Sequence, residues 1–90
     1  MEAFDVLGDP VRRRILELLA TGDRSSGEVT EVISQEFGIS QPAVSMQLRV
    51  LRQSGFAEAR ADGPRRIYAI TAAPMEQVAR VVSVWMQRAK

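Results

Sequence analysis

Hydrogen-bonding side chains recur along one face of a segment near the middle of the chain. Gln41, Ser45 and Arg49 stand four residues apart, a spacing that brings side chains together on one face of an α-helix. Their amide, hydroxyl and guanidinium groups can donate hydrogen bonds to phosphates and to base edges. Residues 38–55 contain no acidic residue that would repel a polyanion. The segment suits a helix in the major groove of DNA, although an ordinary solvated surface helix has a similar polar face.

The residues needed to form and anchor this helix are also present. Ser40 can cap the first turn, Pro42 fits within that turn, and Gly55 can close the last one. Three aliphatic side chains recur at i, i+4 and i+7 and are expected to point into a core: Val44, Leu48 and Leu51. We therefore predict a helix over residues 41–54 with one buried and one polar face.

A second amphipathic segment lies just upstream. Ser25 and Glu28 have the spacing of a capping box, and Gly38 can end the helix that follows. Its expected inward stripe consists of Val29, Val32, Ile33 and Phe37. Because only a short link separates the two segments, residues 26–54 are predicted to form a helix-turn-helix.

An earlier helix is expected to begin at Asp9-Pro10, with Asp9 as its cap and Pro10 in its first turn. Three consecutive arginines at 12–14 lie within it. This run could bind phosphate, or it could form a solvated face with an Arg13–Glu17 pair one turn apart.

After the helix-turn-helix the pattern changes to that of a β-hairpin over residues 56–71. Asp62-Gly63 favours a tight turn, although Pro64 beside it disfavours a plain two-residue loop. The arginines expected around the tip are Arg60, Arg65 and Arg66. A basic hairpin after a reading helix is typical of a wing whose tip lies near the DNA backbone or minor groove. The alternative is that these arginines only keep the hairpin soluble.

The last helix, predicted over residues 74–89, carries a long apolar stripe. Such a stripe could be core, but at the end of a small domain that already has a helix-turn-helix and a wing it favours a dimerisation surface. Residues 1–7 are expected to contribute to the same surface. The expected interface residues are Phe4, Leu7, Met75, Val78, Val82, Trp85 and Met86.

The net charge of +1 conceals an uneven distribution. Residues 1–39 carry a net charge of −4, residues 40–71 carry +3, and residues 72–90 carry +2. Positive charge is therefore concentrated on the proposed reading helix and the segments that follow it. A local basic region bears more directly on nucleic-acid binding than the total charge does.

Composition excludes several classes of function. The 90 residues include no cysteine and no histidine, which rules out disulfides, thiolate or imidazole metal sites, and a serine–histidine pair for catalysis. No glycine-rich loop suits a phosphate-bearing cofactor, so we expect neither an enzyme nor a cofactor. Glu2 and Asp5 stand where a signal peptide would be basic, and Arg80 and Ser83 interrupt the longest apolar run. A soluble cytoplasmic protein is therefore expected.

Four stretches in this order resemble the ArsR/SmtB-type family of bacterial winged-helix transcription regulators. The stretches are residues 7–16, residues 40–45 with 48–51, residues 54–56 and residues 65–68. The resemblance implies a homodimer that binds operator DNA and represses transcription until a signal releases it. It also implies base contacts from Gln41, Pro42, Ser45 and Met46, with Arg49 nearby.

The chain departs from the family pattern at two places. Many members have histidine or arginine at the position of Met46, which here is limited to apolar contacts such as one with a thymine methyl group. Metal-sensing members carry a cysteine box where this chain has residues 28–33, or acidic and histidine ligands on the last helix, where Glu76 is the only acidic residue. A Cys/His metal sensor is therefore not expected, and any inducer is an unknown ligand or a protein partner.

We predict a mainly α fold with a small β-hairpin: about five helices plus a two-stranded antiparallel wing, in a single domain over residues 1–90. The predicted function is that of a dimeric repressor bound to a pseudo-palindromic operator. The predicted DNA-binding residues are Ser40, Gln41, Pro42, Ser45, Met46, Arg49, Arg52, Arg60, Arg65 and Arg66. The alternative is a winged-helix protein-interaction module without specific DNA binding, which would favour an apolar or acidic outer face on the reading helix.

Overall fold

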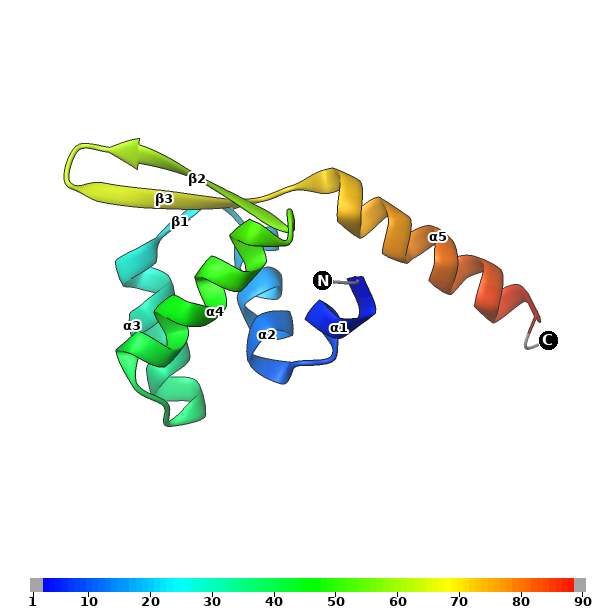
Figure 1. Ribbon diagram of the computed structural model, residues 1–90, viewed down its shortest axis with the longest axis horizontal. Helices are drawn as coiled ribbons and strands as arrows, with labels where there is room; N and C mark the ends of the chain where they lie inside the picture. Colours follow the sequence, from blue (N-terminus) through cyan, green and yellow to red (C-terminus); the bar gives the residue numbers. More distant parts are fainter. Residues whose placement is uncertain (1–2, 89–90) are drawn as a thin grey trace.

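The computed structural model describes residues 3–88, except for the side chains of residues 3, 4, 73–75, 77 and 78. In chain order the elements are α1 (Ala3–Leu7), α2 (Pro10–Ala20), β1 (Arg24–Ser25), α3 (Ser26–Phe37), α4 (Gln41–Gln53), β2 (Ala57–Asp62), β3 (Arg65–Ile70) and α5 (Ala72–Arg88). The predicted five helices and antiparallel hairpin are confirmed within this range. Helices α3 and α4 form the helix-turn-helix, and β2 with β3 forms the wing, which together make a winged helix-turn-helix fold (Figure 1).

One apolar core lies where α2, α3 and α4 meet beneath the sheet (Figure 1). The largest fully buried side chains are Phe56, Ile15, Leu19, Ile33, Leu51, Val6, Val29 and Val44. They come from four helices and from the start of the wing, so the elements share one core. Each such side chain contributes about 1.5–3 kcal/mol when it is removed from water.

The wing and a short third strand form one antiparallel sheet in the order β1-β3-β2. The register pairs Asp62 with Arg65, so the loop consists of Gly63 and Pro64. The predicted turn at Asp62-Gly63 is therefore wrong by one residue, and Pro64 does not prevent a two-residue loop. Gly63 has φ of 59°, as the first central residue of a type II′ turn requires, and the fixed negative φ of proline suits the second position.

The third strand, β1, lies in the polar segment between α2 and α3. Arg24 and Ser25 pair with Tyr68 and Ile67 of β3. Two residues are too few to show the alternating pattern of a strand, so this strand depends on its partner. Ser25 is also the N-cap of α3, which means that the sheet passes directly into the helix-turn-helix.

Helix α4 ends in the hydrogen bonds of a Schellman motif. The Phe56 N–H donates to the Leu51 carbonyl at 2.9 Å, and the Gly55 N–H donates to the Arg52 carbonyl at 3.1 Å. Gly55 has φ of 80°, a left-handed conformation that glycine adopts without a Cβ clash. Phe56 and Leu51 are both buried, so the turn that ends α4 also anchors the start of the wing. The predicted N-caps are confirmed at Asp9, Ser25 and Ser40.

The inward stripe of α3 is narrower than the sequence predicts. Val29 and Ile33 are fully buried, whereas Val32 and Phe37 are 40% and 37% exposed. A helix turns by about 100° per residue, so Val32 lies to one side of the row formed by Val29 and Ile33. Phe37 is the last residue of the helix. The assignment of Val32 and Phe37 to the core is therefore wrong.

Two glycine-to-alanine substitutions test this description of the backbone. Gly63→Ala should lower the free energy of unfolding by about 1–2 kcal/mol, because alanine is strained at positive φ. Gly27→Ala should raise it by about 0.5 kcal/mol, because this glycine is helical. The added Cβ would meet only the Ser25 Oγ, at 3.9 Å. Chemical denaturation of the two variants checks both values, and a loss of stability in Gly27→Ala alone would contradict the assignment.

Candidate nucleic-acid interface

The outer face of α4 is exposed along its whole length. Its exposed residues are Gln41, Pro42, Ser45, Met46, Arg49, Arg52 and Gln53. On the opposite side Val44, Leu48 and Leu51 are 0%, 2% and 0% exposed. The helix is thus held by one apolar row, and its hydrogen-bonding face is directed outward, as the periodicity predicts.

A shallow groove runs between α3 and α4 beside this face. On the α4 side it is lined by Gln41, Pro42, Ser45, Met46 and Arg49, and on the α3 side by Ser26, Gly27, Thr30, Glu31 and Gln35. The α3 residues are absent from the predicted site. Their polar side chains recur at helical spacing, and this signal could have placed them on one face. Glu31 brings a carboxylate to a surface whose α4 side carries no acidic group.

Ser40 has a structural task as well as an exposed position. Its Oγ accepts the Ala43 N–H at 3.2 Å and so caps the first turn of α4. The hydroxyl proton of Ser40 is not used by this bond and can be donated outward. Capping is therefore compatible with the predicted contact between Ser40 and DNA.

The three wing arginines are not gathered on one face. Side chains alternate along β3, so Arg66 lies on the opposite face of the sheet from Arg65. Arg65 pairs with Asp62 at 2.9 Å, and Arg60 pairs with Asp23 at 3.1 Å. All of these side chains are about half or more exposed, and exposed ion pairs of this kind contribute little to stability. The arginines can exchange these carboxylates for phosphate groups at small cost.

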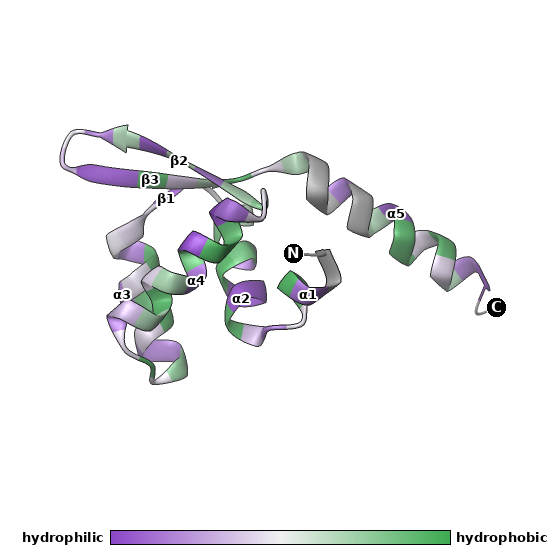
Figure 2. Cartoon of the chain, in the orientation of Figure 1, coloured by the Kyte–Doolittle hydropathy of each residue, from purple (hydrophilic) through white to green (hydrophobic). Residues whose placement is uncertain are grey.

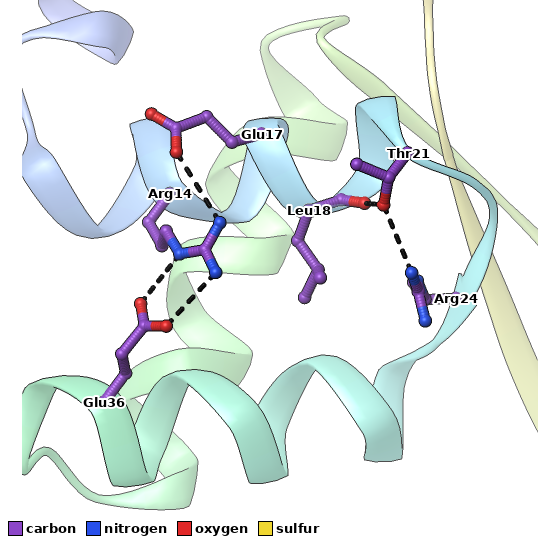
Figure 3. A network of polar contacts seen from close by, with 6 residues as sticks. All are labelled: Arg14, Glu17, Leu18, Thr21, Arg24 and Glu36. Atoms are coloured by element: carbon purple, nitrogen blue, oxygen red, sulfur yellow. Dashed lines mark hydrogen bonds and ion pairs between the residues drawn. The ribbon is translucent and has the colours of Figure 1, made fainter.

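Arg14 in the triple-arginine run connects α2 to α3 (Figure 3). Its guanidinium donates two hydrogen bonds to the Glu36 carboxylate, at 2.8 and 3.2 Å, and lies 3.6 Å from the Glu17 carboxylate. The hydrogen bond and the charge of Glu36 raise the pKa of Arg14 above its ordinary value. The predicted Arg13–Glu17 pair is wrong. Glu17 pairs with Arg14, which is the arginine on the side of α2 that faces α3. The ion pair fixes α2 against α3.

The capping box at the start of α3 fixes the other end of that helix. The Ser25 Oγ accepts the Glu28 N–H at 3.1 Å, and the Glu28 carboxylate accepts the Ser25 N–H at 3.2 Å. These hydrogen bonds with the backbone and side chain of Ser25 lower the pKa of Glu28. The ionised carboxylate therefore stabilises the junction between the sheet and the helix-turn-helix.

Helix α5 leads away from the core, and hydrophobic residues mark much of its second half (Figure 2). Of the predicted interface residues, Val82, Trp85 and Met86 are 39%, 72% and 60% exposed. Val81 and Val84, absent from the predicted stripe, are also exposed and widen it. Leu7 is half-buried against the core. The side chains of Phe4, Met75 and Val78 lie outside the described residues.

Two further observations concern residues 3–88. Among the residues described there, no three His, Cys, Asp or Glu side chains stand together as a metal site would require. None of the described helices combines the length and apolar character needed to cross a membrane.

The sequence pattern of the bacterial regulatory proteins of the arsR family matches residues 9–59. The match begins at the cap of α2, contains the complete helix-turn-helix and reaches into β2. This chain belongs to the arsR family. The family predicted from the four sequence stretches is thereby confirmed.

Named relatives of this arsR-family chain are regulators. The HTH-type transcriptional regulator Rv0081 of Mycobacterium tuberculosis is 46% identical over 71 residues, which cover 79% of this chain and 60% of that protein. Its crystal structure gives a TM-score of 0.72 at 39% identity and covers 97% of this chain and 84% of that one. The biofilm growth-associated repressor of Xylella fastidiosa is 39% identical over 72 residues, covering 80% of this chain and 60% of the repressor.

A solution structure adds a relative with a known assembly. The homodimeric winged helix-turn-helix DNA-binding domain Mb0332 of Mycobacterium bovis has a TM-score of 0.69 at 30% identity, covering 97% of this chain and 74% of that domain. The arsR-family chain spans about three fifths of the length of the curated relatives from Mycobacterium and Xylella.

The lowered pKa of Glu28 generates a test of the capping box in this arsR-family chain. Because the folded-state pKa lies below the ordinary value of 4.5, the ionised carboxylate stabilises the fold above that pH, and the contribution is lost as the pH falls through the folded-state value. We expect wild type to be more stable than Glu28→Gln at pH 7 and the difference to shrink below about pH 4.5. Denaturation at several pH values measures it.

Glu31→Gln is the control for this comparison, since it removes a carboxylate of the same helix that does not belong to the capping box. A stability difference between wild type and Glu28→Gln that is constant with pH would contradict the assignment.

Proposed function

We propose that this chain is a sequence-specific DNA-binding regulator of transcription that acts as a dimeric repressor on a pseudo-palindromic operator. The observation that carries the proposal is the outer face of α4, which is exposed and free of acidic residues while the opposite face is buried. This arrangement allows a helix to enter the major groove without disturbing the core. In the bacterial cell such a protein would act in the cytoplasm, where the DNA is.

Base recognition is assigned to the first turns of α4. Gln41 and Ser45 can hydrogen-bond to base edges, and Arg49 one turn later can reach a guanine or a phosphate. Met46, 54% exposed, offers an apolar contact to a thymine methyl group. Pro42 fixes the first turn and packs beside them. Together these side chains give the helix its sequence preference.

Phosphate contacts position the protein without selecting a sequence. We assign them to the hydroxyl of Ser40 and to the arginines Arg52, Arg60, Arg65 and Arg66. Because Arg65 and Arg66 lie on opposite faces of the hairpin, the wing can place cations on both sides of its tip. Positive charge at α4 and the wing would also attract DNA from a distance, an effect that falls as salt rises.

Dimerisation is assigned to α5 with α1. The exposed apolar side chains of α5 form a continuous surface, and burial against a second copy would remove them from water. Two reading helices related by a two-fold axis select half-sites about 10 base pairs apart or a multiple of that spacing. In this proposal residues 1–90 form one domain, in which 26–54 read DNA, 56–71 form the wing, and 1–7 with 74–89 dimerise.

A protein-interaction module is the competing function. An apolar or acidic face on α4 would favour it, but apart from Met46 and Pro42 the exposed side chains there are polar or cationic. Selection of DNA from a random library by the purified protein, at two salt concentrations, separates the two functions. A dyad-symmetric motif with affinity that falls as salt rises supports the proposal. Weak binding without a motif at either salt concentration would support the competing function.

Single substitutions on α4 test the assigned roles. We expect Arg49→Ala to weaken operator binding by about 1–3 kcal/mol and Gln41→Ala to relax the preference at one base pair. Arg13→Ala is the matched control, because it removes an exposed arginine from α2. Affinities measured across a salt titration check both effects. If both α4 variants bind like wild type, this helix is not the reading helix.

The dimer is tested by a charge placed on α5. Trp85→Glu should convert a dimer into a monomer, because a charge would replace the most exposed apolar side chain among those described in α5. Val32→Glu makes the same change at an exposed aliphatic position of α3 and should leave the dimer intact. Analytical ultracentrifugation at micromolar concentration gives the masses. A monomeric wild type, or a dimeric Trp85→Glu, would contradict the proposed interface.

A further inference from the structure

The guanidinium of Arg12 joins three helices. From its position on α2, its Nε donates to the Val6 carbonyl at 3.1 Å, and its Nη2 donates to the Asp5 carbonyl at 3.1 Å. Its Nη1 donates to Oε1 of Gln47 at 3.0 Å. Val6 and Asp5 belong to the last turn of α1, and Gln47 belongs to α4. One side chain therefore contacts α1 and α4 at the same time.

These contacts are favourable for a cation. The last carbonyls of a helix have no partner within the helix and carry partial negative charge, so Arg12 satisfies two of them in α1. Hydrogen bonds from a charged donor are stronger than neutral ones. The planar fork of the guanidinium suits three acceptors in different directions, an arrangement that a lysine cannot reproduce. Arg12 is therefore neither part of a solvated face nor directed to an external phosphate.

Gln47 belongs to α4, so its hydrogen bond with Arg12 connects α2 to the helix that carries the reading face. Gln47 lies on the same helix as Ser45, Met46 and Arg49 but on a different side, because residues one or two positions apart do not face each other on a helix. Its side chain is half-buried at the flank of α4, whereas those three are exposed. The buried apolar row fixes which side of α4 faces the core, and a hydrogen bond at the flank adds a second restraint on rotation of the helix about its axis.

We propose that Arg12 is a positioning residue that ties α4 to α1 through Gln47, so that the packing of α1 sets the orientation of the reading face. The inference rests on the proposed DNA-binding function and adds a regulatory route to it. Helix α1 also contacts α5, whose exposed apolar face is the proposed dimer surface. Assembly of two copies, or any ligand that shifts α1, would act on α4 through this guanidinium as well as through the shared core.

A double-mutant cycle with the selected operator tests whether Arg12 and Gln47 act through one hydrogen bond. Arg12→Met and Gln47→Met should each weaken operator binding about tenfold, a coupling of the size found within such networks. The double variant should bind no more weakly than Arg12→Met alone, because one interaction is lost in all three proteins. Losses that multiply would overturn the proposal, since Gln47 would then contact DNA independently of Arg12.

Two controls distinguish the positioning role of the Arg12 side chain from the effect of its charge. Arg13→Met removes a positive charge from the neighbouring position of α2, and we expect binding within about threefold of wild type for an exposed residue outside the interface. Arg12→Lys keeps the charge but not the fork, so its affinity should stay close to that of Arg12→Met. Recovery of wild-type affinity in Arg12→Lys would show that charge alone matters and would overturn the proposal.

Hydrogen exchange of the free protein tests the Arg12–Gln47 connection without DNA. In Arg12→Met and Gln47→Met, the amides of residues 45–49 should exchange faster, while those of residues 29–33 in α3 should be unchanged. Equal acceleration in α3 and α4 would indicate general loss of stability, and no change would mean that α4 is not held by Arg12; either outcome overturns the inference. If wild type selects no operator, the proposed function fails. Hydrogen exchange still tests whether Arg12 holds α4 through Gln47.

Discussion

Burial of one row of aliphatic side chains on α4 is the interaction on which the rest of the structure depends. Val44, Leu48 and Leu51 fill the space between α2 and α3, and the turn that follows brings Phe56 into the same core. Each contributes about 1.5–3 kcal/mol by leaving water, so the row fixes which side of α4 faces inward. The hydrogen-bonding side chains must then face outward. The same burial that stabilises the domain thereby creates its candidate recognition surface.

Arginine has two different tasks in this chain: some arginines bond to neighbouring helices, and others are available to an external anion. In α2, Arg12 and Arg14 bond to neighbouring helices and hold α4 and α3 in place. On α4 and the wing, Arg49, Arg52 and Arg66 are exposed and directed away from the core. The amino-terminal part of the chain is acidic overall, which supplies partners for arginines within the fold. Beyond residue 40 acidic residues are fewer, so cationic side chains remain available to an external anion.

The features that could be predicted from the sequence are those that short-range rules determine. Caps at Asp9, Ser25 and Ser40 and the period of the aliphatic residues locate the helices, because each depends on residues within a few positions. Strand β1 and the Arg14–Glu36 pair join segments far apart in sequence, and no local pattern predicts them. The α3 side of the groove differs: the spacing of its polar side chains is a local signal, but their position beside α4 follows only from the packing of the two helices. The predicted hairpin loop is wrong by one residue, because Gly63 can occupy a turn over residues 62–63 or one over residues 63–64.

Ser25 ends β1 and caps α3, so no linker residue separates the sheet from the helix-turn-helix at this junction. The two parts are therefore expected to move as one rigid body, with little internal freedom to lose when a ligand binds. On the proposed function, DNA would meet a preformed surface, so that association would need no ordering step in the wing. The rate of encounter would then be set by diffusion and by orientation of the charged face, and it would slow as ionic strength rises.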